Sequence, residues 1–168
     1  MSKRTFLALA VIALALSGES LAASAPEEPS GWGRYRDRQF GLVFDFPAAT
    51  FSLKSAEQAR EGVVFSTPDG RAHIRVFGFP NETGDTPARY LRRIAKPDEA
   101  KFTYVRTDAR FFVASGTRDG MIFYRRCNFS AAERRVSCLQ MDYPQGEKRA
   151  WDGIVTRISR SLRMAALD

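Results

Sequence analysis

Segments with the composition of β-strands follow one another in pairs along most of this chain, with short turn signals between them. The clearest pair is 62–67 and 71–79, which flanks Pro68-Asp69-Gly70, where proline opens a turn and glycine accepts a positive φ. Strands joined by turns this short run antiparallel. Similar pairs are expected at 32–38 with 40–46, at 101–106 with 111–117, and at 121–129 with 135–143. The sequence therefore predicts a largely antiparallel sheet.

Both cysteines lie in the last of these pairs. If its turn is centred between Ala132 and Glu133, the antiparallel register places Cys127 opposite Cys138. Opposed residues on antiparallel strands have Cβ atoms about 4.5–5.5 Å apart, which is close to the disulfide range. We expect a structural disulfide in an oxidising compartment, the alternative being two buried free thiols. The spacing of the two cysteines does not fit a CxxC redox site.

Two helices are expected to pack on this sheet. Thr86 is a suitable N-cap and Pro87 a suitable first residue for a helix that reaches about Ala95 and ends before Pro97. Residues 145–162 form a second helix with one apolar stripe, which consists of Trp151, Ile154, Val155, Ile158 and Leu162. The predicted fold class is α+β, an α/β/α sandwich around the antiparallel sheet.

Residues 1–22 have the pattern of a secretory signal peptide. Lys3 and Arg4 precede the apolar run 6–16, small residues follow, and cleavage is expected before Ala23. The run is shorter than the ~20 residues of a spanning helix, so an uncleaved membrane anchor is the less favoured alternative. Neither cysteine lies near the cleavage site, so no lipid anchor is expected there. These features predict a periplasmic or secreted protein without a transmembrane anchor after cleavage.

The remaining chain is expected to form one domain. Residues 23–33 are interpreted as a flexible N-terminus, 34–163 as a single α+β domain and 164–168 as a C-terminal tail. Loss of residues 1–22 removes two basic residues and one acidic residue, so the formal charge changes from +7 to +6. The basic character therefore belongs to the folded part of the chain.

Candidate catalytic residues are few. His73 is the only histidine, which excludes a histidine cluster for zinc or iron, and neither Ser66 nor Ser115 lies in a G-x-S-x-G elbow. Asp45 is the carboxylate least easily explained by a turn, because it lies in an apolar strand. No phosphate-binding glycine pattern is present. The sequence predicts no catalytic residue, metal or cofactor, and hydrolysis of an envelope polymer is retained as an alternative.

Basic residues cluster at helical spacing on both predicted helices. The candidate anion-binding residues are Arg89, Arg92, Arg93 and Lys96 on the first helix, and Arg149, Arg157, Arg160 and Arg163 on the second. Arginine suits phosphate and carboxylate groups, so these faces predict an anionic partner, the alternative being ordinary solvated faces. A contiguous positive face built from both helices would favour polyanion binding. Nucleic acid is not favoured, because the aromatic residues occupy core-like strand positions.

The order of elements also resembles the Mog1/PsbP-like superfamily. The resemblance rests on Phe40-Gly41-Leu42-Val43-Phe44-Asp45-Phe46-Pro47, on Thr86-Pro87, and on a closing helix with Trp151 and Ser161-Leu162-Arg163. It covers about residues 33–163. It implies an α/β/α sandwich that serves as a binding or accessory module, and no catalytic residues come with it.

These observations together favour a non-enzymatic exported protein of the cell envelope that binds a partner. The partner is an unidentified protein or an anionic envelope component. A polyanion-binding protein that uses the arginine-rich helix faces is the first alternative, and an envelope hydrolase is the second.

Overall fold

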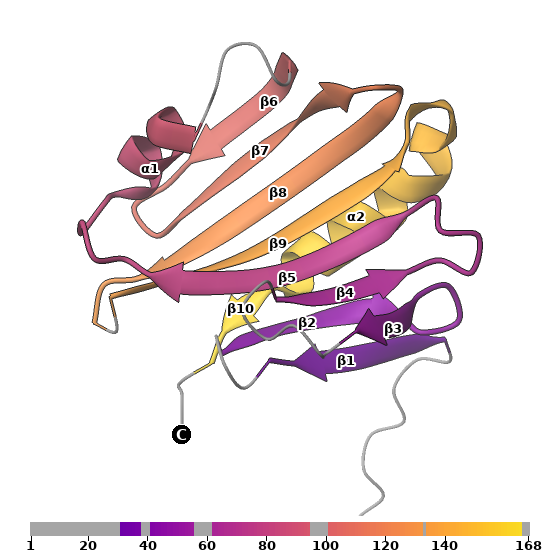
Figure 1. Cartoon of the computed structure of the whole chain (residues 1–168), viewed down its shortest axis with the longest axis horizontal. Helices are drawn as coiled ribbons and strands as arrows, with labels where there is room; N and C mark the ends of the chain where they lie inside the picture. Colours follow the sequence, from indigo (N-terminus) through magenta and orange to yellow (C-terminus); the bar gives the residue numbers. More distant parts are fainter. Residues whose placement is uncertain (1–30, 38–40, 56–61, 95–100, 133, 166–168) are drawn as a thin grey trace, which may run out of the picture.

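The computed structural model describes residues 31–37, 41–55, 62–94, 101–132 and 134–165 (Figure 1). Within these ranges the chain forms two antiparallel sheets and two α-helices. The predicted signal peptide, most of the segment 23–33 and residues 166–168 lie outside the described residues. Among the helices in the described ranges, none is long and apolar enough to cross a membrane.

The larger sheet has seven strands in the order β3-β4-β5-β9-β8-β7-β6. Every neighbouring pair is antiparallel, as the succession of hairpins predicts. The strands are β3 (Ser52–Ser55), β4 (Val63–Ser66), β5 (His73–Pro80), β6 (Lys101–Thr107), β7 (Phe111–Arg118), β8 (Met121–Ser130) and β9 (Arg135–Pro144). The two longest strands, β8 and β9, pair in the middle of this sheet, and their register places Cys127 opposite Cys138.

The smaller sheet brings the two ends of the described chain together. It consists of β1 (Trp32–Arg36), β2 (Leu42–Pro47) and β10 (Arg163–Met164), in the order β1-β2-β10. In β10, Arg163 pairs with Val43 and Met164 with Leu42. The backbone N–H of Ala165 also donates to the carbonyl of Gly41 at 2.6 Å.

The helix α2 (Lys148–Ser161) covers one face of the larger sheet together with the smaller sheet. Phe44 of β2, Leu139 of β9 and Ile158 of α2 are fully buried in the core between them. Trp151 closes one end of this core, where its ring lies 5.7 Å from the rings of both Phe51 and Tyr143. The apolar stripe predicted on this helix therefore faces the sheet, with Ile154 at its partly buried margin.

The helix α1 (Pro87–Ile94) lies on the opposite face of the larger sheet. Side chains alternate between the two faces of a strand, and in β8 Arg126 contacts α2 while the next residue, Cys127, belongs to the cluster that α1 covers. Tyr90 of α1 stacks on Phe79 at 5.3 Å and on Phe112 at 6.0 Å. The disulfide is buried in this second core, and α1 covers only one end of the face, as Figure 1 shows.

The α+β sandwich with one helix on each face confirms the predicted fold class. Four details differ. The segment 145–162 begins with a 3₁₀ turn, Gln145–Glu147, because Gly146 is a poor helix former, and α2 ends at Ser161. Arg163 therefore lies in a strand and not on the helix. Two short strands, β3 and β10, were not predicted, and the strands form two sheets where one was expected.

The disulfide gives the first prediction. Reduction of Cys127–Cys138 should lower the free energy of unfolding by about 2–3 kcal/mol, because the bridge closes a short loop in the unfolded chain. Urea unfolding with and without reductant measures this difference. Thiol titration of the denatured, unreduced protein should find no free thiol, and two free thiols would contradict the prediction.

The buried stripe of α2 gives the second prediction. Ile158→Ala should destabilise the protein by about 2–4 kcal/mol, because the side chain is fully buried between the sheets and leaves a cavity. Thr156→Ala, an exposed change on the same helix, is the control for helix propensity. Equal melting temperatures for the two variants would show that α2 does not pack as described.

Candidate functional site: a basic cleft

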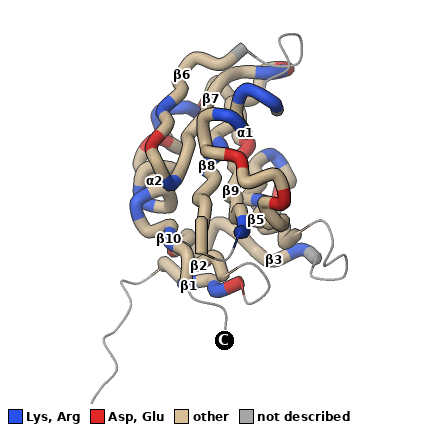
Figure 2. Tube along the Cα trace, turned by 90° about the vertical axis from the view of Figure 1, so that its left-hand side faces the viewer, with Lys and Arg blue, Asp and Glu red and all other residues tan. Residues whose placement is uncertain are grey.

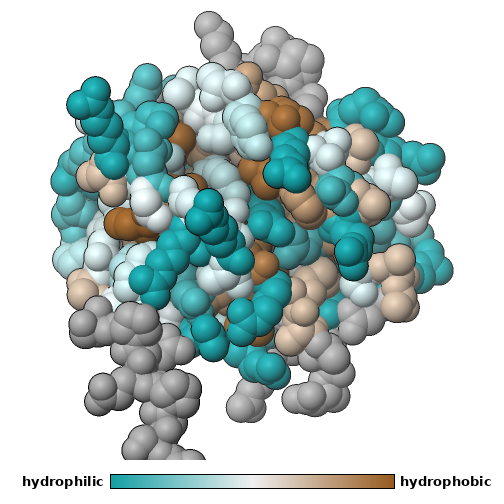
Figure 3. All heavy atoms as spheres, turned by 180° about the vertical axis from the view of Figure 1, so that it is seen from behind, coloured by the Kyte–Doolittle hydropathy of each residue, from teal (hydrophilic) through white to brown (hydrophobic). Residues whose placement is uncertain are grey.

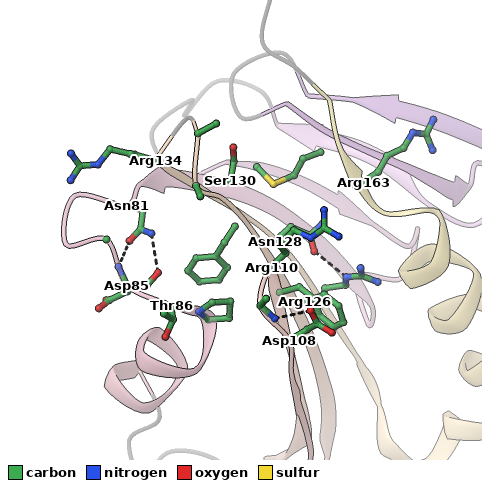
Figure 4. A pocket seen from close by; sticks show the side chains of 18 of the residues that line it. Asn81, Asp85, Thr86, Asp108, Arg110, Arg126, Asn128, Ser130, Arg134 and Arg163 are labelled. Carbon is green, nitrogen blue, oxygen red and sulfur yellow. Dashed lines mark hydrogen bonds between the residues drawn. The ribbon is translucent and has the colours of Figure 1, made fainter.

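A cleft of about 1040 Å³ opens at the end of the larger sheet, beside the N-terminus of α1 (Figure 4). Four parts of the chain that are distant in sequence enclose it. They are the connection from β5 to α1, the turn between β6 and β7, the turn between β8 and β9, and residues 162–164 that follow α2. We call this hollow the basic cleft.

One wall of the basic cleft is the connection that leads into α1. The side-chain amide of Asn81 donates to the carbonyl of Asp85 at 3.0 Å, and its oxygen accepts from the backbone N–H of Asp85 at the same distance. Thr86 then caps α1 as predicted, since its hydroxyl oxygen accepts from the N–H of Arg89 at 3.3 Å. These bonds fix the shape of a loop that would otherwise have few constraints.

The opposite wall is built around Phe111. The guanidinium carbon of Arg126 lies 4.7 Å from the centre of this ring, and that of Arg106 lies 5.7 Å from it. Arg110 directly precedes Phe111 and lines the cleft. In Figure 4, Arg110 and Arg126 lie together beside Asn128, across the cleft from Asn81 and Asp85. We call Arg106, Arg110 and Arg126 the Phe111 arginine cluster.

Arg126 is the best anchored of the three arginines. Its Nε donates to Asn128 Oδ1 at 3.1 Å, and its Nη1 donates at 2.8 Å to the carbonyl of Ser159 near the end of α2. Burial lowers the pKa of Arg126, and the positive charge of Arg106 lowers it further. Two guanidinium groups over one ring repel each other as like charges, and a bound anion would relieve that repulsion.

The carboxylates of the basic cleft do not balance its arginines. Arg110, Arg126, Arg134 and Arg163 line it, against Asp85 and Asp108. The carboxylate of Asp85 is already bound by Arg93, whose Nη2 donates to it at 2.7 Å. Asp108 accepts a hydrogen bond from the N–H of Ala109 at 2.7 Å. The cleft is therefore electropositive, and its guanidinium donors suit a carboxylate or phosphate group.

Only part of the basic face predicted on α1 is available to bind an anion. Arg89 and Arg92 are exposed. Arg93, however, forms the ion pair with Asp85, and its guanidinium carbon lies 4.9 Å from the centre of the Tyr90 ring. Lys96 lies outside the described residues. Arg93 thus stabilises the entry into α1, which the helical spacing alone did not reveal.

The basic residues predicted on the second helix are divided between three settings. Arg149 and Arg160 are exposed on α2, whereas the guanidinium carbon of Arg157 lies 4.0 Å from the centre of the Trp32 ring. Arg163 lies in β10 at the edge of the basic cleft. Figure 2 shows α1 and α2 on opposite sides of the strands, so their basic faces do not form one contiguous surface.

The view from behind in Figure 3 shows hydrophilic side chains over much of the face, with small hydrophobic areas between them.

Four arginines near the cleft were not predicted as site residues: Arg106, Arg110, Arg126 and Arg134. They lie in strands and turns, where no helical spacing marks them, and the pairing of β6, β7 and β8 brings the first three together. The register of these strands, which was not predicted, holds the signal that would identify two of them. In the observed pairing Val113 of β7 faces both Arg106 and Arg126, which places these two residues on the same face of the sheet.

His73 lies in a second, smaller hollow of about 470 Å³ on the face that α1 leaves open. Its Nδ1 is 2.9 Å from the hydroxyl of buried Ser66, and Asp142 lies opposite it in the register. Among the described residues, however, no hydrogen bond joins a carboxylate to His73, and Asp142 accepts from Gln140 at 2.8 Å. This pair lacks the oriented base of a hydrolytic triad.

The presence of the carboxylate Asp45 in an apolar strand is explained by an ion pair. Its Oδ1 accepts from Arg34 Nε at 2.7 Å across the β1–β2 pair, and its backbone N–H donates to the hydroxyl of Ser161. In the described part of the chain, no group of three or more His, Cys, Asp or Glu residues is placed to hold a metal ion.

The paired strands, the helix on each face and the closing strand together define the Mog1/PsbP-like fold. Two solved structures that share it are cyanobacterial PsbP (CyanoP) from Synechocystis sp. PCC 6803 and the Ran-binding protein Mog1p of Saccharomyces cerevisiae. The first is 12% identical with a TM-score of 0.62, and covers 86% of this chain and 99% of its own. The second is 8% identical with a TM-score of 0.52, and the match covers 82% of this chain and 96% of the yeast protein. No family model matches the sequence, and the comparison with curated proteins found no match.

The ion pair at the entry to α1 gives the third prediction. Arg93→Gln should lower the melting temperature at neutral pH, whereas Arg92→Gln, on the same helix and exposed, should not. Hydrogen bonding from Arg93 lowers the pKa of Asp85 below its ordinary value of 3.8. The stabilisation should therefore be complete above this ordinary value and should be lost as the pH falls through the lower, folded-state pKa. Melting curves of the natural chain and of Arg93→Gln between neutral and strongly acidic pH measure the effect. If the difference between their melting temperatures were the same in acid as at neutral pH, the prediction would be wrong.

Proposed function

We propose that this chain is a non-enzymatic, exported accessory protein of the cell envelope that binds a partner through an anionic group in the basic cleft. The Phe111 arginine cluster carries this proposal. The guanidinium groups of Arg106 and Arg126 both lie over the Phe111 ring, and Arg110 lines the cleft directly before it. Arg106 and Arg110 are exposed. Clustering of like charges is unfavourable for folding alone, and it is useful where an opposite charge binds.

Export is supported by the signal-peptide pattern of residues 1–22 and by the disulfide, which is stable in an oxidising compartment. A partner-binding role agrees with one of the structural neighbours, because the yeast protein is described as Ran-binding. That likeness concerns the fold, so the identity of the partner must come from the surface chemistry of this chain.

Binding of polyanions along the helix faces is less well supported than binding in the basic cleft. The two faces lie on opposite sides of the sheet, Arg93 is committed to Asp85, and Arg157 lies over Trp32. The cleft gathers its arginines from separate elements into one hollow, where a single ligand can contact several of them.

Retention on an acidic polymer gives the fourth prediction. The double variant Arg106→Gln/Arg110→Gln should elute from phosphocellulose at clearly lower salt than the natural chain, with binding at least about tenfold weaker, since each charged hydrogen bond contributes about 1.5–3 kcal/mol. Rising salt should weaken retention of every form, because exposed charges are screened.

Arg89→Gln/Arg92→Gln is the matched control, since it removes the same charge from exposed positions on α1. Equal losses in the two double variants would mean attraction by net charge alone and would contradict the assignment to the cleft. A greater loss in the α1 variant would instead favour the helix face. Thermal melting of each variant checks that the fold is retained.

A further inference from the structure

The outer edge of β6 is open in the part of the chain that the structure describes. β6 is the last strand of the larger sheet and pairs there only with β7. The residues from Phe102 to Thr107 are all exposed. An edge strand presents a row of backbone N–H and C=O groups that another extended chain can pair with.

In the ranges that the structure describes, the exposed large apolar side chains are concentrated on this strand. Of the four large hydrophobic residues described as exposed, Phe102, Tyr104 and Val105 lie on β6. Phe102 packs edge-on against Phe123 at 5.6 Å, so one side of its ring is supported. Tyr104 and Val105 point to opposite faces, so apolar side chains are exposed on both sides of this edge.

The two edges of the larger sheet differ in how well they are protected. The opposite edge strand, β3, has only four residues and a register shift between Leu53 and Ser55. The register shift in β6 is confined to its start, between Phe102 and Tyr104, and the strand then pairs regularly as far as Thr107. β6 contains no proline. It is thus the longer and more regular template for strand addition.

Charge decides which kind of chain suits this edge. Arg106 of β6 lies over the same Phe111 ring as Arg126, which lines the cleft, so the strand leads to the arginine-bearing wall of the cleft. A second copy of this chain would bring the same cluster to the edge, together with a formal net charge of +6 once residues 1–22 are removed. An acidic chain would bring compensating carboxylates instead.

We infer that β6 binds an extended acidic segment of a partner protein by strand addition, with a carboxylate of that segment held by the Phe111 arginine cluster. Side chains of an added strand alternate between the faces. The residue opposite Arg106 therefore shares the face of the cluster and carries the carboxylate, while an apolar residue lies opposite Val105 on the other face. This inference rests on the proposed function and names the chemistry of its partner.

A pair of synthetic peptides gives the fifth prediction. The probe is a peptide of about eight residues in which glutamate and valine alternate, a length within the normal range of strands. The control has proline in place of each valine, so it carries the same charge but cannot form a ladder. The first peptide should bind at least about tenfold more tightly by fluorescence anisotropy, because ladder bonds and apolar contacts add to the charge attraction.

Hydrogen exchange locates the bound peptide. Addition of a strand should slow exchange of backbone amides within residues 102–107, whereas contact with the cleft alone leaves them unchanged. Val105→Glu should weaken binding of the glutamate–valine peptide by at least about tenfold, because it replaces an apolar contact with the opposed valine and adds a negative charge to the edge. Leu53→Glu is the matched control at the other edge, since both side chains are 49% exposed, and it should change binding by no more than about twofold.

Each contrary result is distinguishable. Equal binding of the two peptides without protection of β6 would overturn strand addition and leave anion binding at the cleft intact. Failure of both peptides to bind would overturn the acidic segment as the partner, while phosphocellulose retention separately decides the proposed function. Dimerisation of the free chain with protection of 102–107, measured by sedimentation and exchange, would assign this edge to a second copy and overturn the inference.

Discussion

The pairing of β8 with β9 is the interaction on which the rest of the structure depends. These strands are the longest in the molecule and lie in the middle of the larger sheet, so their register sets what each face presents. One face carries Cys127, Cys138 and Phe129 under α1, and the other carries Leu139 and Met141 under α2. A slip of one residue would exchange the two sets, because side chains alternate with a period of two. The disulfide at matched positions prevents that slip covalently.

This alternation also explains why so much of the fold could be predicted. The turn at Asp119-Gly120, with a positive φ at both residues, and the polar break after Ser130 are local signals, so the central hairpin and its cysteine pairing follow from short segments. The stripe that contains Trp151 and Ile158 is equally local. β3 and β10 could not be predicted in this way. Both are short, and β10 has only two residues and becomes a strand because β2 offers it an edge.

The candidate site was less predictable than the fold for a related reason. Helical spacing detects residues on one helix, and it selected Arg93 and Arg157. In the structure Arg93 forms an ion pair with Asp85, and the guanidinium of Arg157 lies over the Trp32 ring. The residues of the basic cleft come from separate strands and turns, and only their pairing in three dimensions brings Arg106 and Arg126 to the same ring. Their proximity depends on the register of three strands at once. That information is present in the sequence but is distributed along it.

The closure of the smaller sheet by β10 bears on when this protein can fold. β2 is made near the start of the described chain, and its partner β10 at the very end. Helix α2, which buries Leu42 and Phe44, also comes late in the sequence. An N-terminal portion of the chain therefore has no means of completing its own sheet or core, and contacts of such long sequence separation form slowly. The smaller sheet is complete only after residues 163–164 have been made, which is compatible with the export in an extended form that is proposed for this chain.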